Sequence, residues 1–442
     1  MKDIMAEMNT LLEEIIADFH ERSLPALTPR ETRLPALKGK IDAVIGMRRT
    51  GKTWFLYQRM QSLLAQGIPR HRLLYVNFDD DRLHPFRRED LRAITEVYYR
   101  LYPDNRGQTC FFFFDEIQNV DGWELFLRRL LDTEELQLAV TGSSARLLSR
   151  EIATSLRGRA LTTEIFPFSF REALQFQGVE LTASPPGAQR RALYANRLRD
   201  YLLQGGFPEV QGVGAPYHHD ILQGYVDVVI LRDVVERHGV SNIAPLRYLI
   251  RHLLGAPATL FSIHRFHNDL KSQGIACGKN TMHEYLDHLT DVYLVEMVPI
   301  HSRSPRQQQV NPRKAYVIDT GLALAFRHQA QIDRGRLLEN LVFGALRRKG
   351  HSIAYYRTTE GYEVDFHASA DNGSVQLIQV CESLQAPDTR QRELRALTAA
   401  MRECGLQQAL VVSLEESEWI EQDDLHIEVI PAWRWLLEQS QT

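Results

Sequence analysis

Short apolar segments alternate with amphipathic stretches between residues 41 and 166. The apolar segments cover residues 41–45, 73–78, 110–114, 136–141 and 161–166. Strand-length apolar runs that alternate with helical patterns are typical of parallel strands joined by crossover helices. The pattern therefore predicts an α/β fold in which a parallel sheet is flanked by helices.

Two segments precede this region. Residues 4–19 place apolar side chains at helical spacing, which predicts a helix whose apolar stripe packs against the rest of the protein. Residues 23–40 contain three prolines and scattered arginines, a composition that indicates a connector. We therefore expect an N-terminal helix and connector over residues 1–35, followed by an α/β core over residues 36–180.

The remainder divides into three further parts. A helical pattern interrupted by Gly-Gly-Phe-Pro at 205–208 predicts a helical lid over residues 181–242. Three helical stretches followed by two strand-like segments have the element order of a winged helix, expected over residues 243–332. Mixed helical and strand-like patterns predict a second α/β domain over residues 333–442.

Length and composition place the chain among folded globular proteins. Its 442 residues exceed the usual size of one hydrophobic core, and 44% hydrophobic with 24% charged residues argues against extensive disorder. The longest apolar runs are far shorter than the ~20 residues of a membrane-spanning helix. The four cysteines form no Cys-x-x-Cys pair. These features predict a cytoplasmic protein with reduced cysteines that does not enter the membrane.

The segment Gly46-Met-Arg-Arg-Thr-Gly-Lys-Thr matches the phosphate-binding pattern Gly-x-x-x-x-Gly-Lys-Ser/Thr, between a predicted strand and a predicted helix. Glycines let the backbone wrap around phosphates, and amides at the helix start point at the anion. We expect Lys52 to reach the β and γ phosphates of ATP, and Thr53 to bind Mg2+. The residues expected to surround the nucleotide are Gly46, Arg48, Arg49, Thr50, Gly51, Lys52, Thr53 and Trp54.

A strand of phenylalanines ends in two acids, Asp115 and Glu116. Ligands of open parallel sheets bind beyond the carboxyl ends of the strands. Asp115 is therefore expected in the magnesium shell, and Glu116 as the base that polarises the attacking water. The alternative is a buried strand that ends in solvated acids, and the accompanying phosphate-binding segment favours the catalytic interpretation.

Two further segments carry candidate contacts to the γ-phosphate. The sequence Thr141-Gly-Ser143-Ser144 ends a predicted strand, so its hydroxyls could lie between the two nucleotide segments; the alternative is an ordinary turn. Arg157 and Arg159 follow a predicted helix at the domain edge. Either could reach the nucleotide of a neighbouring subunit as an arginine finger, or both could be solvated surface arginines.

Together these segments resemble a large bacterial and archaeal family of AAA+-type P-loop ATPases with a C-terminal domain of unknown function. The resemblance implies ATP binding and hydrolysis with Mg2+, a homo-oligomer for which a hexamer is one option, and a winged helix after the lid. It also implies a C-terminal domain similar to restriction-endonuclease-like nucleases. The matching segments are 46–53, 115–120 with Gly122 and Trp123, 141–144, 156–159, 166–172, 205–209, Arg232 with Asp233, and 314–321.

Nucleases of that fold bind magnesium through a helix Glu, a strand-end Asp and an acid-x-Lys segment on the next strand. Glu339 and Asp365 match the first two, whereas Gln379-Val-Cys stands where the acid and the lysine would be expected. Glu363 and Glu382 are the alternative carboxylates. Because the lysine is missing as well, the resemblance implies a vestigial site that binds or scaffolds, and an active nuclease is the alternative.

A net charge of −4 gives no whole-chain attraction to nucleic acid, so DNA binding would need a local basic patch. Residues 297–318 contain no acid, and the candidate DNA contacts are Lys279, Arg303, Arg306, Arg313 and Lys314. The alternative is a solvated loop, because Glu284 and Asp287 lie on the same predicted helix as Lys279. Two function classes stay open: an ATP-driven machine that acts on DNA, and an ATP-dependent switch whose appended domains bind proteins.

Overall fold

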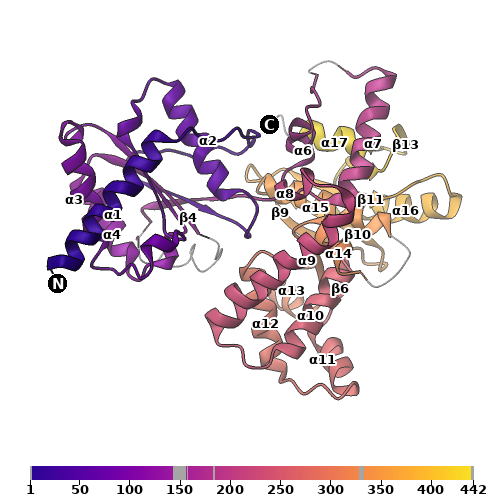
Figure 1. Cartoon of the computed structure of the whole chain (residues 1–442). Coiled ribbons are helices and arrows are strands. Elements are labelled where there is room, and N and C mark those ends of the chain that lie inside the picture. Colours follow the sequence, from indigo (N-terminus) through magenta and orange to yellow (C-terminus); the bar gives the residue numbers. More distant parts are fainter. Residues whose placement is uncertain (1, 143–155, 157, 183–184, 328–332, 440–442) are drawn as a thin grey trace. The chain divides into compact units, whose positions relative to one another are not determined.

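The computed structural model divides the chain into two compact units, unit 1 (Met1–Ile165) and unit 2 (Phe166–Thr442). It describes residues 2–142, 156, 158–182, 185–327 and 333–439 (Figure 1). In this part of the chain, no helix is both long and apolar enough to cross a membrane.

Unit 1 contains a parallel sheet with the strand order β2-β3-β4-β1-β5. Its helices and strands are α1 (Lys2–Glu21), β1 (Ile41–Ile45), α2 (Lys52–Ala65), β2 (Leu73–Asn77), α3 (Leu91–Leu101), β3 (Cys110–Asp115), α4 (Trp123–Thr133), β4 (Leu136–Gly142) and β5 (Ala160–Glu164). Single 3-10 turns lie at Arg70–Arg72, Asp81–Leu83, Pro103–Asn105 and Ile117–Asn119. The parallel P-loop sheet predicted from the apolar segments is confirmed, and β4 separates β3 from β1.

The phenylalanines of β3 explain why helices cover both faces of this sheet (Figure 1). Alternate side chains of a strand point to opposite faces. Phe111 and Phe113 pack in one cluster with Phe19 of α1 and Phe55 of α2. On the other face, Phe112 meets Tyr98 of α3 and Phe114 meets Phe126 of α4. A strand buried on both faces positions its carboxyl end rigidly, and Asp115 stands at that end.

Unit 2 begins with helices, after which come a small antiparallel sheet and a larger mixed sheet. The helices before residue 256 are α6 (Phe170–Phe176), α7 (Ala188–Gln204), α8 (Pro208–Gln211), a 3-10 turn (Ala215–Tyr217), α9 (His218–Val228), a π-helix (Val229–Glu236) and α10 (Ile243–Gly255). Phe166 lies in this unit, where its ring packs beneath the guanidinium groups of Arg347 and Arg348. The structure thus assigns residues 166–180 to unit 2, although the sequence pattern placed them with the α/β core; the five-part division remains a prediction.

The small sheet has the order β6-β8-β7. Its elements are β6 (Thr259–Phe261), α11 (Ile263–Ser272), α12 (Lys279–Asp291), β7 (Val295–Val298), α13 (Pro305–Val310), β8 (Arg313–Val317) and α14 (Thr320–Ala325). The sequence pattern predicted α10, α11, α12, β7 and β8 but neither β6 nor α13.

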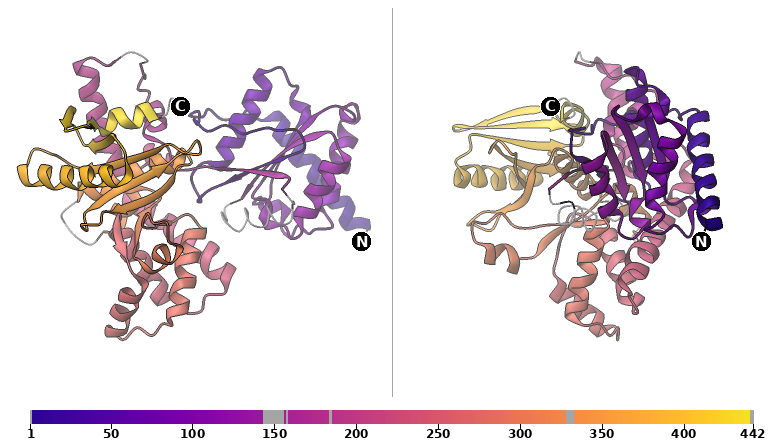
Figure 2. Two further views of the ribbon diagram at one scale, coloured as in Figure 1. Left: turned by 180° about the vertical axis from the view of Figure 1, so that it is seen from behind. Right: turned by 90° about the vertical axis from the view of Figure 1, so that its left-hand side faces the viewer.

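The larger sheet has the order β13-β14-β12-β11-β10-β9, and α16 packs along it (Figure 2). Its elements are α15 (Arg334–Arg348), β9 (Ser352–Arg357), β10 (Glu363–Ser369), β11 (Val375–Cys381), α16 (Pro387–Cys404), β12 (Gln408–Ser413), β13 (Glu418–Gln422), β14 (Leu425–Pro431) and α17 (Ala432–Gln439). This sheet confirms the additional C-terminal α/β domain.

Asp319 fastens the Gly-Gly-Phe-Pro interruption to the segment that follows β8. Its carboxylate accepts hydrogen bonds from the amides of Gly206 at 2.6 Å and Leu322 at 3.2 Å. Burial raises the pKa of Asp319 to about 6, and the donated amide bonds oppose that rise. The Gly-Gly-Phe-Pro segment is therefore a turn whose backbone is held by hydrogen bonds to the buried Asp319.

Candidate nucleotide-binding site

The loop that connects β1 to α2 has the backbone geometry of a phosphate cradle. Gly46 has a φ of 143°, and a Cβ at this position would overlap the carbonyl oxygen of Ile165. Arg49 and Gly51 have left-handed φ values of 68° and 95°. Successive changes of backbone hand turn consecutive amides toward one concave side, where an anion can bind. The loop also opens α2, whose N-terminus adds its own amides.

Lys52 lies over this loop. The side chain is 5% exposed, and its Nζ donates to the carbonyl oxygens of Gly46 at 3.1 Å and Met47 at 3.2 Å. The same Nζ is 4.0 Å from Oε1 of Glu116. The ammonium thus lies between the loop 46–53 and the acids at the end of β3.

Asp115 is the buried centre of a hydroxyl network. Its Oδ2 accepts from the hydroxyls of Thr53 at 2.7 Å and Tyr75 at 2.9 Å, and its Oδ1 accepts from Thr141. Burial, followed by the neighbouring Glu116 charge, raises the pKa of Asp115, while the hydroxyl donors oppose the rise. The network links α2, β2, β3 and β4 through one carboxylate.

Glu116 is turned out of the strand by a left-handed φ of 52°. Its amide donates to Oγ1 of Thr141 at 2.9 Å, and its Oε2 accepts from Nε2 of Gln118 at 2.5 Å. The side chain is 17% exposed, so it keeps some access to water. A carboxylate with fixed direction and partial access has the properties that a general base needs.

The other predicted nucleotide residues differ in their environments. Thr50 is buried and donates to the carbonyl of Met47 at 2.9 Å, so its hydroxyl braces the loop. Arg48 is half-buried, Arg49 is exposed, and Trp54 is 50% exposed with its ring 5.7 Å from that of Tyr57. Ser143, Ser144 and Arg157 lie outside the described residues. Arg159 is exposed and pairs with Asp132.

Two contacts in this region were not predicted. Tyr75 bonds to Asp115 because β2 is the direct neighbour of β3 in the sheet. Arg30, in the connector, donates from Nη1 to the carbonyl of Thr50 at 3.3 Å. Tyr75 carried one sequence signal, a hydroxyl-bearing residue near the carboxyl end of an apolar strand, whereas Arg30 carried none.

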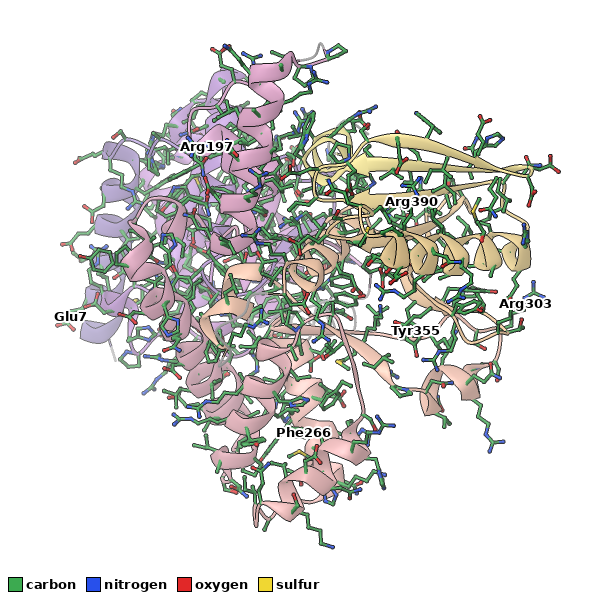
Figure 3. The ribbon with its side chains drawn as sticks, turned by 90° about the vertical axis from the view of Figure 1, so that its right-hand side faces the viewer. Glu7, Arg197, Phe266, Arg303, Tyr355 and Arg390 are labelled. Atoms are coloured by element: carbon green, nitrogen blue, oxygen red, sulfur yellow. The ribbon has the colours of Figure 1, made fainter. Side chains whose placement is uncertain are left out.

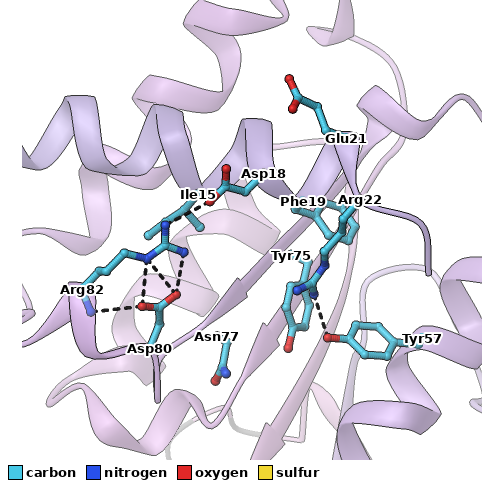
Figure 4. Close-up of a pocket in the computed structure, with 10 residues that line it drawn as sticks. All are labelled: Ile15, Asp18, Phe19, Glu21, Arg22, Tyr57, Tyr75, Asn77, Asp80 and Arg82. Atoms are coloured by element: carbon cyan, nitrogen blue, oxygen red, sulfur yellow. Dashed lines mark hydrogen bonds and ion pairs between the residues drawn. The ribbon is translucent and has the colours of Figure 1, made fainter. Parts of the chain in front are cut away.

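A pocket of about 580 Å³ lies beside Tyr75, between α1, α2 and β2 (Figure 4). Arg22 reaches across it to the hydroxyl of Tyr57 at 2.9 Å, while Arg82 bridges Asp18 and Asp80. The pocket is therefore lined by acidic and basic side chains. Tyr75, whose hydroxyl bonds to Asp115, is one of its lining residues.

The predicted nuclease-like residues also come together, within unit 2. Glu339 of α15 and Asp365 of β10 both contact the ammonium of Lys314, which β8 supplies. The side-chain amide of Gln379 does not contact Lys314 but donates to Glu393 at 2.6 Å. Of the alternative carboxylates, Glu363 joins the cluster, whereas Glu382 instead lies 3.9 Å from an arginine at the start of α15.

Lys314 was predicted as a surface contact to DNA, and that prediction is wrong. The residue is 3% exposed because its side chain points from β8 into the carboxylate cluster. The remaining predicted contacts are exposed, and none of them forms an ion pair with another described residue; they are Lys279, Arg303, Arg306 and Arg313. As it stands, the described part of the chain holds no group of three or more His, Cys, Asp or Glu side chains disposed to bind a metal ion.

Family models match three consecutive parts of the chain. An AAA domain matches residues 38–174, and two domains of unknown function, DUF8612 and DUF4143, match residues 195–333 and 334–435. An uncharacterized protein of Methanocaldococcus jannaschii is 33% identical over 98% of this chain and 96% of its own length. An uncharacterized protein of Haemophilus influenzae is 29% identical over 74% of this chain and 79% of its own.

Two solved structures are similar at low identity. A Walker-type ATPase of Pyrococcus abyssi is 13% identical with a TM-score of 0.41, and the match covers 72% of this chain and 94% of that one. The ORC1 protein of Aeropyrum pernix, solved in complex with DNA, is 14% identical with a TM-score of 0.28, and the match covers 73% of this chain and 91% of that one.

The sheet, the phosphate-type loop and the acids at the end of β3 define a P-loop protein of the AAA ATPase class. The chain belongs to the family of the Methanocaldococcus jannaschii protein. In this chain the AAA domain precedes two domains of unknown function.

Proposed function

We propose that the chain binds ATP with Mg2+ at the loop 46–53 and hydrolyses it to ADP and phosphate. One observation carries the proposal, the convergence of loop and acids at one point. Thr53 donates to Asp115 at 2.7 Å, and Lys52 lies 4.0 Å from Glu116. These four side chains come from the two segments that a phosphoryl-transfer site requires.

The donor set fits the nucleotide and its metal. Thr53 and Asp115 offer the hydroxyl and carboxylate oxygens that Mg2+ prefers, and they already share a hydrogen bond. When bound, the ion would neutralise charge on the transferring phosphoryl group. Lys52 would exchange its carbonyl contacts for phosphate oxygens, and Glu116 would orient the attacking water.

Two substitutions separate binding from chemistry. Lys52→Ala should abolish the ATP-dependent rise in melting temperature, because the loop loses its cation. Glu116→Gln should keep that rise while phosphate release falls by about 100-fold or more, because an amide cannot act as the base. Lys38→Ala, whose side chain is 88% exposed, is the matched control and should change neither quantity. Normal turnover by the Glu116 variant would show that another group is the base.

We further propose that helices α10–α12 and the sheet β6-β8-β7 form a winged-helix surface that contacts DNA. The support is a group of exposed cations without carboxylate partners among the described residues: Lys279, Arg303, Arg306 and Arg313. Arg303, labelled in Figure 3, belongs to the acid-free segment that connects β7 to β8. Cations that make no ion pair with the protein are available to phosphates.

DNA binding through these arginines has a quantitative signature. Duplex DNA should bind with an affinity that falls as salt rises, and replacing Arg303, Arg306 and Arg313 by Ala should lower the salt slope by roughly one per lost phosphate contact. Arg402→Ala is the control, because Arg402 already pairs with Asp423. If the triple variant binds DNA with an unchanged salt slope, these arginines do not contact the DNA phosphates. Absence of DNA binding, together with nucleotide-dependent assembly, would favour the protein-binding switch.

Oligomerisation and the arginine finger belong to the same proposal. Arg159 is exposed, and its pairing with Asp132 is a surface contact that solvent weakens. If subunits share sites, Arg159→Ala should reduce turnover, and mixing it with the Glu116→Gln variant should restore part of it. Full activity of Arg159→Ala alone would remove this residue as a finger, and native mass measurement with and without ATP gives the subunit number.

A further inference from the structure

The strongest unexplained feature is a buried lysine among three acids in unit 2. The Nζ of Lys314 lies 2.9 Å from Oε1 of Glu339, 3.0 Å from Oε1 of Glu363 and 2.8 Å from Oδ1 of Asp365. The lysine side chain is 4% exposed, and those of Glu339 and Asp365 are each 11% exposed. Two N–H groups of the Lys314 ammonium donate to Glu339 and Asp365, and Glu363 is a third ion-pair partner.

Other groups also contact the three acids. The hydroxyl of Tyr316 donates to Oε1 of Glu339 at 2.7 Å, and the amide of Val380 donates to Oδ2 of Asp365 at 3.0 Å. The guanidinium of Arg357 lies 3.6 Å from Oε2 of Glu363. Lys314 is therefore the central cation of a polar network that also includes Tyr316, Val380 and Arg357.

Its location has two consequences. Glu339 and Asp365 occupy the places of the metal-binding Glu and Asp in the nuclease-like arrangement, so the ammonium contacts the oxygens that a divalent ion would need. Lys314 also comes from the part of the chain that matches one domain of unknown function, while all three acids come from the part that matches the next. The lysine thus joins two domains that the family models separate.

Burial alone would disfavour a charged lysine here, but the three carboxylates outweigh it and raise the pKa of Lys314. Three acid oxygens at 2.8–3.0 Å form the surroundings of an ammonium ion. An ammonium and a divalent cation repel each other, and the carboxylates cannot hold both at hydrogen-bonding or coordination distance.

We propose that the Lys314 ammonium takes the place of the divalent cation in this nuclease-like site, so that the site excludes Mg2+ and serves as an internal ionic lock between β8 and the C-terminal sheet. The proposal rests on the nuclease-like arrangement of α15, β10 and β11 and is independent of the proposed ATPase activity.

A lysine that assists cleavage is the opposing interpretation. Such a lysine must reach an attacking water or a phosphate, yet the side chain of Lys314 is 4% exposed, donates to two buried carboxylates and pairs with a third, partly exposed one. Gln379, at the place of the third ligand, donates to Glu393 and accepts from the amide of Asp365 at 3.2 Å. The geometry therefore favours the lock.

Removing the ammonium should expose a latent divalent-cation site. Carboxylate oxygens bind Ca2+ at about 2.3–2.6 Å, so the acids that now surround the ammonium need to contract by only roughly 0.5 Å. Lys314→Ala should bind Ca2+ where the unaltered protein does not. Arg402→Ala is the control, because Arg402 is exposed and pairs with Asp423.

The experiment uses the full chain without nucleotide and measures Ca2+ binding by calorimetry and the melting temperature with and without Ca2+. The unaltered protein, Arg402→Ala and Asp365→Asn should show the same Ca2+ binding. Lys314→Ala should melt lower, recover at least half of the lost melting temperature in Ca2+, and lose that recovery when combined with Asp365→Asn.

Two results would overturn the lock. One is Ca2+ binding, or Mg2+-dependent DNA cleavage, by the unaltered protein that Asp365→Asn removes. The other is a folded Lys314→Ala variant that binds no additional Ca2+. If Lys314→Ala does not fold, the comparison of the unaltered protein with Asp365→Asn still decides whether the site holds a cation other than the lysine. ATP hydrolysis should be unaffected in Asp365→Asn, so failure of the lock and failure of the ATPase proposal are distinguishable.

Discussion

Thr141 is the residue through which the two acids of the candidate nucleotide site are held together. It is fully buried on β4, its hydroxyl donates to Oδ1 of Asp115, and the same oxygen accepts from the amide of Glu116 at 2.9 Å. Valine has nearly the same shape but no hydroxyl. Thr141→Val therefore removes both hydrogen bonds with little change in packing.

The size of the effect follows from what each partner loses. Asp115 is buried, and a hydrogen bond to a charged group is worth about 1.5–3 kcal/mol. The Glu116 amide lies nearer to solvent, so its loss adds about 1 kcal/mol. We expect the free energy of unfolding of unit 1 to fall by about 2–4 kcal/mol. We also expect kcat for ATP hydrolysis to fall by roughly 10- to 100-fold, because Glu116 loses its anchor and small misplacements of catalytic groups are costly.

The assay combines urea unfolding, steady-state ATP hydrolysis and an ATP-binding titration. ATP affinity should stay within about threefold of that of the unaltered protein, because Lys52 and its loop do not contact Thr141. Thr141→Ser should restore most of the activity. Thr163→Val, on β5 at the edge of the same sheet, removes another buried hydroxyl and should leave turnover unchanged. Unaltered turnover and stability in Thr141→Val would refute the network as the support of Glu116.

Other predictions test the backbone and the buried acid of unit 2. Gly46→Ala should abolish the ATP-dependent rise in melting temperature, because a side chain there overlaps the carbonyl of Ile165 and strains a φ of 143°; retained binding would contradict this geometry. Asp319→Ala should lower the free energy of unfolding of unit 2 by about 2–4 kcal/mol, since the amides of Gly206 and Leu322 lose their acceptor, and urea unfolding measures this loss. Because burial raises the pKa of Asp319 to about 6, its contribution to stability should be greatest below about pH 4 and decline as the pH rises to about 6; Asp319→Asn should remove this part of the pH profile of urea unfolding.

The parts of the fold that sequence reasoning predicted are those whose signals are local. Each strand of unit 1 is a short apolar run, and the nucleotide loop is a continuous motif, so neighbouring residues carry the information. β6 has only three residues, from Thr259 to Phe261, too few to show an alternating pattern, and it exists because it pairs with β8. α13 did carry local signals, a proline in its first turn and Ser304 at its N-cap, which the acid-free pattern of its segment obscured.

The same distinction explains the candidate sites. Two sequence motifs predict the nucleotide-site residues Lys52, Thr53, Asp115 and Glu116. Tyr75 joins their hydrogen-bond network only because β2 lies beside β3 in the sheet. The whole fold determines which distant segments of the chain meet in space, so the sequence of a single segment does not predict such contacts.

Lys314 shows how a composition pattern can mislead. It lies in a basic, acid-free segment, so the linear sequence suggested a cation facing solvent. Its carboxylate partners stand 25 residues away at Glu339 and 51 residues away at Asp365, and the fold brings them to it. A lysine beside arginines in sequence was thereby neutralised by acids from another part of the chain.

Lys52 and Lys314 are both buried, and they illustrate why residue type alone does not define a cation-dependent site. Lys52 rests on backbone carbonyls and stays 4.0 Å from Glu116, so a phosphate can recruit its ammonium while the acids keep their own roles. Lys314 lies 2.8–3.0 Å from three carboxylates, so a phosphate could reach its ammonium, or a metal ion its carboxylates, only after these largely buried ion pairs break. The ammonium of Lys52 contacts backbone carbonyls that phosphate oxygens can replace. The ammonium of Lys314 already forms its ion pairs with acids of the chain. Chemistry is therefore expected at the end of β3, and mechanical coupling at the carboxylates of the C-terminal sheet.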